Sequence, residues 1–118
     1  MSPRLTLAEQ NDRFRSVMQI PQFEASELKG RHLITRGVAA LPPVAQIEII
    51  AKVRDFNVFT EENDPYGEHD FGAIEHEGVG TIFWKIDYYD LDYEMGSPDP
   101  SDPSVTRRVL TIMLASEY

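Results

Sequence analysis

One stretch of the chain decides the fold: residues 69–89 read HDFGAIEHEGVGTIFWKIDYY. Within it, residues 69–77 and 81–89 alternate apolar and polar side chains, as strands with one buried face do. Between them lies Gly78-Val79-Gly80, a short glycine loop typical of the turn between two antiparallel strands. The stretch therefore predicts a β-hairpin.

The alternation also predicts which face of the hairpin is buried. If Glu77 pairs with Thr81 across the turn, Ile74 lies opposite Trp84. A slip of one residue would scatter the apolar side chains over both faces, so we favour this pairing. The predicted core face carries Ile74, Ile82, Trp84, Ile86 and Tyr88.

Two helices are predicted before the hairpin. Residues 4–19 have apolar side chains at helical spacing, and Thr6 with Glu9 three positions later is typical of a capping box. Pro21 is expected to end this helix. A second helix is predicted from residue 43 to about residue 57, because a proline pair favours a helix start there.

Further elements complete the predicted fold. Residues 32–36 are expected to form a short strand, and residues 104–117 a buried helix, since their apolar side chains cover most of a helical circumference. Arg107 and Arg108 of that helix are expected to pair with acidic residues. The whole chain, residues 1–118, is predicted to be one α+β domain: a small antiparallel sheet centred on the hairpin, packed against two or three helices.

Charge is distributed very unevenly along the chain. The 118 residues carry a formal net charge of −9. Residues 55–102 hold fourteen acidic side chains and one basic side chain, Lys85, whereas the rest of the chain has a net charge of +4. An acidic field of this kind repels phosphates and attracts basic surfaces. We therefore expect a basic protein surface as partner and no direct contact with nucleic acid.

Several classes of protein are excluded by composition. The chain has no cysteine, which excludes disulfide scaffolds, thiolate nucleophiles and cysteine-ligated metal sites. No apolar run is long enough to span a bilayer, and the first twenty residues do not resemble a signal peptide. We expect a cytoplasmic protein with no membrane contact; the sequence leaves its oligomeric state open.

Two acidic segments, residues 60–70 and 87–102, are the predicted contact regions. Their tyrosines are suited to anchor a protein interface, and their carboxylates to select a basic partner. The candidate partner-binding residues are Glu61, Glu62, Asp64, Tyr66, Glu68, Asp87, Tyr89, Asp90, Asp92, Tyr93 and Glu94. No catalytic residue is assigned.

A metal or acid–base site is the alternative interpretation. His69 stands between Glu68 and Asp70, and in the predicted register it lies diagonal to Asp87, with Asp90 nearby. A histidine–carboxylate pair can hold a metal ion or transfer protons. If the protein only binds a partner, no cofactor is expected. If it has a metal or acid–base site, a divalent cation is expected at His69 and Asp70.

Several motifs resemble one bacterial family. They include Asn63–Gly72, Phe83–Asp90, Gly96–Pro100, the ending from Arg108 to Tyr118, and Asn11–Arg15 near the start. These motifs are similar to those of the domain of unknown function 3768 family. The resemblance implies a small single-domain protein, in many members encoded on plasmids or other mobile genetic elements. It implies no activity and no catalytic residues.

Three hypotheses follow. The first is an acidic binding protein of a mobile element, such as a DNA mimic that inhibits a host restriction or CRISPR enzyme. The second is a metal-dependent or acid–base enzyme that uses the Glu68, His69, Asp70, Asp87 and Asp90 cluster. The third is an accessory subunit with no site of its own.

Overall fold

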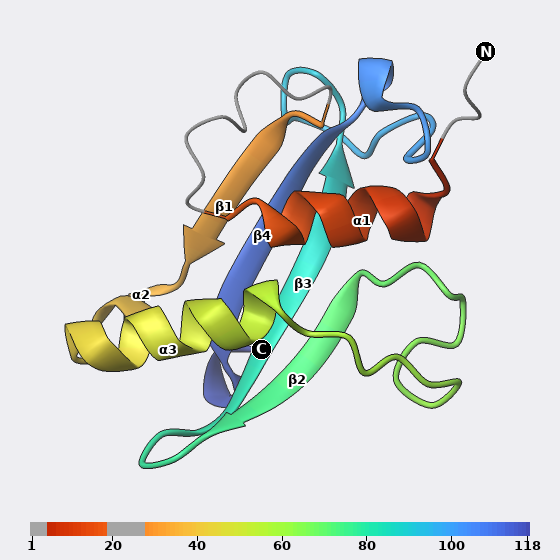
Figure 1. The fold of residues 1–118 in the computed structure, drawn as a ribbon. Helices are drawn as coiled ribbons and strands as arrows, with labels where there is room; N and C mark the ends of the chain where they lie inside the picture. Colours follow the sequence, from red (N-terminus) through yellow and green to blue (C-terminus); the bar gives the residue numbers. More distant parts are fainter. Residues whose placement is uncertain (1–4, 19–27) are drawn as a thin grey trace.

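The computed structural model describes residues 5–18 and 28–118. They form an α+β domain in which a four-stranded sheet carries helices on one face (Figure 1). The strands are β1 (Gly30–Ile34), β2 (Phe71–His76), β3 (Gly80–Tyr89) and β4 (Arg107–Leu114), in the spatial order β1-β4-β3-β2. The α+β class is thus confirmed.

The N-terminal helix α1 (Leu7–Ser16) confirms the prediction at residues 4–19 with shorter bounds. Thr6 accepts a hydrogen bond from the backbone of Glu9, and the Glu9 carboxylate accepts one from the Thr6 backbone, so the capping box is present. These bonds also lower the pKa of Glu9. Pro21, the predicted helix end, lies outside the described residues.

The second predicted helix is α3 (Pro43–Arg54), which follows the short helix α2 (Arg36–Ala39). Its buried side chains are Ile49 and Val53, whereas Ile47 is 67% exposed. Ile47 therefore does not contribute to the core. The apolar residues of this helix are distributed around its whole circumference, so their spacing alone does not identify the face that packs on the sheet.

The hairpin is present as β2 and β3, but its register differs from the prediction by two residues. Ile74 pairs with Ile82, and Gly72 pairs with Trp84. An even shift keeps every side chain on its predicted face, so Ile82 and Trp84 are fully buried as expected. A side chain at Gly72 would collide with the Trp84 indole, which explains a glycine in mid-strand.

The predicted helix at residues 104–117 was wrong. This segment forms strand β4, with one 3₁₀ turn before it (η2, Pro103–Val105) and one after it (η3, Ala115–Glu117). β4 pairs with β1 on one side and β3 on the other. Leu110 and Ile112 on one of its faces and Val109 and Met113 on the other are all buried, so apolar residues occupy both faces. Such a run resembles a buried helix in composition.

The sheet is mixed rather than antiparallel. β1 confirms a strand in the region predicted at residues 32–36, but it spans Gly30–Ile34, and Arg36 already begins α2. The strand runs parallel to β4. Helices α1 and α3 lie across the same face of the sheet, while the opposite face carries no helix (Figure 1). The core between helices and sheet contains Phe14, Ile49, Ile82, Trp84, Leu110 and Ile112.

Candidate functional site

The two predicted contact regions are linked through α1. The side chain of Gln10 donates a hydrogen bond to the carbonyl of Ser101, and that of Asn11 donates one to the carbonyl of Glu68. Both donor side chains are buried. The N-terminal half of α1 therefore lies between the two acidic segments and fixes them to one body (Figure 1). Sequence reasoning placed α1 only in the core and missed this role of its polar face.

The segment 60–70 is built by its own polar side chains. Thr60 and Asn63 exchange side chain–backbone hydrogen bonds, and the Asp64 carboxylate accepts from the backbone N–H groups of Glu68 and His69. The Asp64 side chain is only 5% exposed. It therefore holds the loop together and leaves little of its carboxylate exposed for the contact predicted for it.

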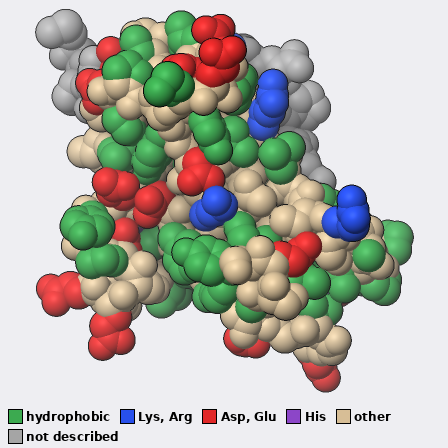
Figure 2. Space-filling view, turned by 180° about the vertical axis from the view of Figure 1, so that it is seen from behind, with side chains coloured by type: hydrophobic (Ala, Val, Ile, Leu, Met, Phe, Trp, Pro, Cys, Tyr) green, Lys and Arg blue, Asp and Glu red, His purple; other side chains and the backbone are tan. Residues whose placement is uncertain are grey.

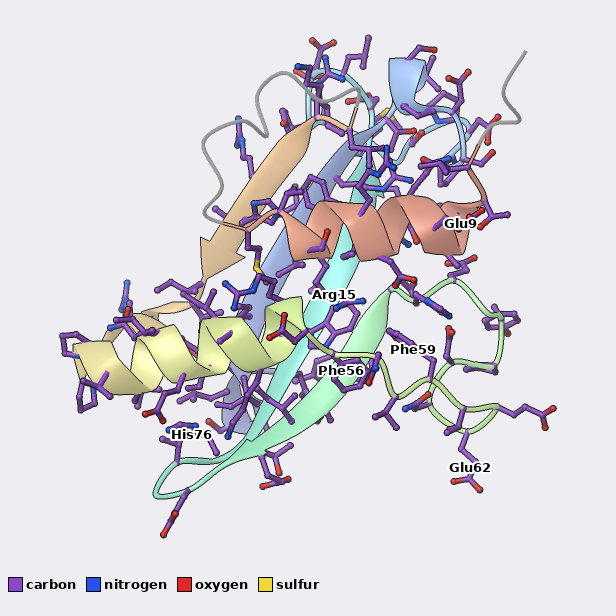
Figure 3. The ribbon with its side chains drawn as sticks, viewed as in Figure 1. Glu9, Arg15, Phe56, Phe59, Glu62 and His76 are labelled. Carbon is purple, nitrogen blue, oxygen red and sulfur yellow. The ribbon has the colours of Figure 1, made fainter. Side chains whose placement is uncertain are left out.

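Other side chains of this segment are well exposed. Glu61 and Glu62 are exposed, and Tyr66 is 87% exposed. Figure 3 shows Glu62 at the tip of the loop, directed away from the body of the protein. Glu68 is half-buried and lies within hydrogen-bond distance of the Tyr88 hydroxyl. The outer half of the segment is thus available for contact.

The segment 90–96 has the same organisation. The Asp90 carboxylate accepts from the backbone N–H groups of Asp92 and Glu94, which leaves the side chains of Asp92 and Glu94 exposed. Tyr93 has a positive φ of 58° and packs near Tyr89, with 6.3 Å between ring centroids. A loop that holds a tyrosine in this sparsely populated conformation is firmly built.

Asp87 lies apart from these groups. Its carboxylate pairs with Lys85 at 3.0 Å on the helix-free face of β3. The pairing with His69 predicted from the diagonal register is therefore wrong, because His69 precedes β2 and does not join the strand ladder. Figure 2 shows this helix-free face, with acidic side chains standing at several of its edges.

His69 is held between two carboxylates. Its Nδ1 lies 2.9 Å from Asp12 Oδ1, and its Nε2 lies 3.6 Å from Asp64 Oδ2. The ring stacks on Phe59 with 3.8 Å between centroids, and the backbone has a positive φ of 56°. His69 thus fastens the acidic loop to α1 through Asp12, a contact that was not predicted from the sequence.

Asp70 is the other candidate ligand. Burial raises its pKa to about 6, and the nearby Glu68 carboxylate adds to this rise. Within residues 5–18 and 28–118, no group of three or more histidine, aspartate or glutamate side chains is placed to hold a metal ion. His69 and Asp70 are adjacent in the chain, but the structure supplies no third ligand from this part of the chain.

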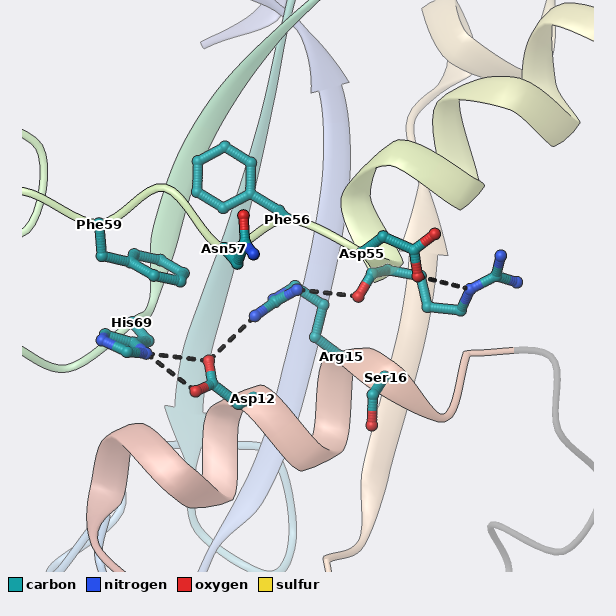
Figure 4. Close-up of a pocket in the computed structure, with 9 residues that line it drawn as sticks. Asp12, Arg15, Ser16, Asp55, Phe56, Asn57, Phe59 and His69 are labelled. Carbon is teal, nitrogen blue, oxygen red and sulfur yellow. Dashed lines mark hydrogen bonds and ion pairs between the residues drawn. The ribbon is translucent and has the colours of Figure 1, made fainter.

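A cleft lies beside His69. Its volume is about 320 Å³, and it opens between α1 and the segment that follows α3 (Figure 4). Asp12 and Arg15 of α1 contribute to its lining, with Phe56 and Phe59 on the opposite element. The Arg15 side chain is nearly buried and donates to Asp12 at 2.9 Å. The cleft therefore combines charged and aromatic groups.

Within the part of the chain that the structure describes, Arg108 does not pair with an acidic side chain, contrary to the prediction. It is fully buried and donates to Asn11 Oδ1, Gln10 Oε1 and the carbonyl of Pro100, all of them neutral acceptors. Burial lowers its pKa. Arg107 donates only to the neighbouring carbonyl of Thr106 among the described residues. The buried arginine organises α1 and the loop before β4 without cancelling surface charge.

These features define a small α+β protein with a strongly acidic surface. The family model described as protein of unknown function DUF3768 matches residues 34–117, which is more than half of the chain, so the chain belongs to this family. The motif at Asn11–Arg15 lies before the matched region. No curated protein and no solved structure matches the chain. Among the described residues, no helix is long and apolar enough to cross a membrane.

Proposed function

We propose that the protein is an acidic binding protein that contacts a basic surface of another protein through residues 60–70 and 87–102. One observation carries this proposal. Among the described residues, no lysine or arginine lies within ion-pair distance of Glu61, Glu62, Asp92 or Glu94. Their charge is therefore uncompensated, and a partner with complementary charge would gain both speed and specificity of association.

The construction of the loops supports the same function. The carboxylates of Asp64 and Asp90 accept hydrogen bonds from loop backbone N–H groups and so hold the neighbouring carboxylates in place before binding. A surface that is already ordered loses less conformational entropy on association. In addition, the Tyr93 ring accommodates the guanidinium of Arg31 at 4.0 Å, the kind of contact that a partner's arginine makes with tyrosine.

In its more specific form, the proposal is that the protein is a DNA mimic. Many enzymes of host defence bind nucleic acid in basic channels, and ordered carboxylates can occupy such channels in place of phosphates. The mobile-element setting that the family resemblance implies favours a restriction or CRISPR enzyme as the target. The partner would then be a nucleic-acid-handling protein, with no direct contact between this protein and nucleic acid.

The test is a capture experiment with two charge-matched variants. Tagged wild-type protein is incubated with host extract at low and moderate salt, with and without competing double-stranded DNA. The loop variant replaces three exposed carboxylates of the acidic segments, and the control replaces three carboxylates of α3 and the hairpin. The loop variant is E61Q/E62Q/E94Q, and the control variant is E48Q/E75Q/E77Q.

A DNA-binding enzyme that is retained by the wild type and the control, lost by the loop variant and displaced by DNA is the expected result. Equal loss in both variants would show that only net charge matters and would contradict the proposal. If a partner is captured but DNA does not displace it, the result would support a basic partner and contradict the DNA-mimic form of the proposal.

A second candidate function keeps the metal or acid–base interpretation, and the 2.9 Å contact between Asp12 and His69 beside the cleft favours it. The carboxylate orients the imidazole as in acid–base pairs. The test is thermal unfolding with and without Mn²⁺ or Mg²⁺. A rise in melting temperature that disappears in H69Q and D70N supports a cation site, and an equal rise in these variants contradicts it.

A further inference from the structure

The cleft beside His69 has the features of a ligand site that the acidic segments do not need. Phe56 and Phe59 contribute aromatic surface, and the coplanar stack of Phe59 on His69 forms one wall (Figure 4). Figure 3 shows Arg15, Phe56 and Phe59 close to one another near the start of β2. A volume of about 320 Å³ suits a small organic molecule.

Arg15, which contributes to the lining of this cleft, has one hydrogen-bond donor without an acceptor in the described part of the chain. Its Nη1 donates to the carbonyls of Val53 and Arg54, and its Nη2 donates to Asp12. The Nε group is buried and has no hydrogen-bond partner among the described residues, while the side chain as a whole is 4% exposed. A buried donor without an acceptor costs about 1–3 kcal/mol. An acceptor oxygen supplied by a ligand would recover that cost.

Arg54 supplies a second cation at the edge of the cleft. Its Nε lies 3.3 Å from Asp55, and its side chain is 38% exposed. No partner for its terminal nitrogens is present among residues 5–18 and 28–118. The Asp12 carboxylate, in contrast, is already shared between Arg15 and His69. The cleft thus offers arginine N–H groups that have no acceptor among the described residues, whereas the Asp12 carboxylate already accepts from Arg15 and contacts His69.

We infer that the cleft binds a small molecule that carries one carboxylate on an aromatic or apolar body. The carboxylate accepts hydrogen bonds from Arg15 and Arg54, since guanidinium groups match carboxylate geometry. The body of the ligand lies against Phe56 and Phe59. The net charge of −9 and the neighbouring Asp55 disfavour a phosphate dianion relative to a monoanion. This site is independent of the proposed contact with a basic protein.

The experiment uses benzoate as the probe and the whole chain as the protein. Titrations are followed by the arginine Nε–H signals in ¹H–¹⁵N NMR spectra, at constant ionic strength maintained with chloride. Benzamide, which lacks the charge, and inorganic phosphate are the comparison ligands. The expected result is a saturable shift of the Arg15 signal with benzoate and weaker binding of both comparison ligands.

Two variants make the assignment specific. R54Q, at the edge of the cleft, should weaken benzoate binding by about tenfold, the effect of losing one charge-assisted hydrogen bond. R36Q, which removes an arginine of α2 outside the cleft lining, should leave the affinity unchanged. Arg15 itself is not replaced because it also holds α1 to the end of α3.

Shifts that grow linearly without saturation, or equal affinity in R54Q and wild type, would overturn the inference. Tighter binding of phosphate than of benzoate would overturn the carboxylate assignment. Neither result depends on the exposed carboxylates of the acidic segments, so this test and the capture experiment fail separately.

Discussion

The interior and the acidic segments of this protein use charge in opposite ways. Inside, Arg15 and Arg108 are buried, and most of their hydrogen bonds go to backbone carbonyls and side-chain amides. On the surface, the carboxylates of Glu61, Glu62 and Glu94 have no basic partner among the described residues. Burying bases on neutral acceptors keeps them from neutralising the surface. The acidic field is therefore a consequence of how the fold is assembled.

The largest effect is expected from the interior. Replacing Arg108 by methionine leaves Gln10, Asn11 and the Pro100 carbonyl without their buried donor, so we expect a loss of about 3 kcal/mol in the free energy of unfolding. Urea unfolding measures this difference. The neighbouring R107M is the control and should lose less than about 1 kcal/mol. Equal losses of stability in R108M and R107M would contradict the claim that the buried Arg108 organises the fold.

The second-largest effect on stability is expected at Asp64, whose carboxylate accepts hydrogen bonds from the backbone of its own loop. D64A removes the acceptor for two backbone N–H groups and the contact with His69, so we expect a loss of about 1–2 kcal/mol of stability. E61A, in the same loop but exposed, should stay within about 0.5 kcal/mol of wild type. Denaturant midpoints compare the two. If both variants were equally stable, Asp64 would belong with the contact residues.

A smaller effect with a defined pH dependence is expected at Asp70. Its pKa is about 6 in the folded protein against 3.8 for an ordinary aspartate, so the folded state disfavours the charged form. Stability contributed by this group falls as pH rises from about 4 to about 6 and stays lower above that range.

The variant D70N removes this titration. At pH 7.5 it should raise the free energy of unfolding by about 1 kcal/mol, a value reduced for solvent screening at a half-buried group. Thermal unfolding between pH 4 and pH 8 measures how the stability of the wild type and of D70N changes with pH. A D70N protein with the same pH slope as wild type would contradict this account of Asp70.

The smallest effect on stability is expected from the exposed carboxylates. E61Q/E62Q/E94Q should change the free energy of unfolding by less than about 0.5 kcal/mol per site, because exposed residues without ion pairs contribute little. Chemical unfolding monitored by tryptophan fluorescence tests this, with Trp84 as the buried reporter. A marked loss of stability would mean that these side chains serve the fold.

The hairpin was predictable because two signals agreed there: the alternation of β2 and β3 and the glycines of the turn. Its register was not, because Gly78 and Gly80, both with positive φ, support turns of different length. A shift of two residues also preserves the buried face. The helix predicted over the segment Arg107–Leu114 was wrong because a strand that is buried on both faces shows no alternation of apolar and polar residues.

The candidate site was predictable only in part. The exposed positions of Glu61, Glu62 and Tyr66 agree with the expectation from composition, whereas the structural roles of Asp64 and Asp90 depend on loop geometry. The contacts of Asp12 and Arg108 join residues far apart in the chain. Long-range polar contacts of this kind leave no local pattern in a single sequence.

The central claim is that residues 60–70 and 87–102 are the surface that attracts cationic groups. The most direct measurement is a titration of the ¹⁵N-labelled protein with a short oligoarginine peptide, followed by backbone ¹H–¹⁵N NMR at two salt concentrations. The account predicts salt-sensitive shifts concentrated at Glu61, Glu62, Asp92 and Glu94. Shifts of equal size at Glu75 and Glu77 of the hairpin, or shifts spread evenly over all acidic residues, would contradict it.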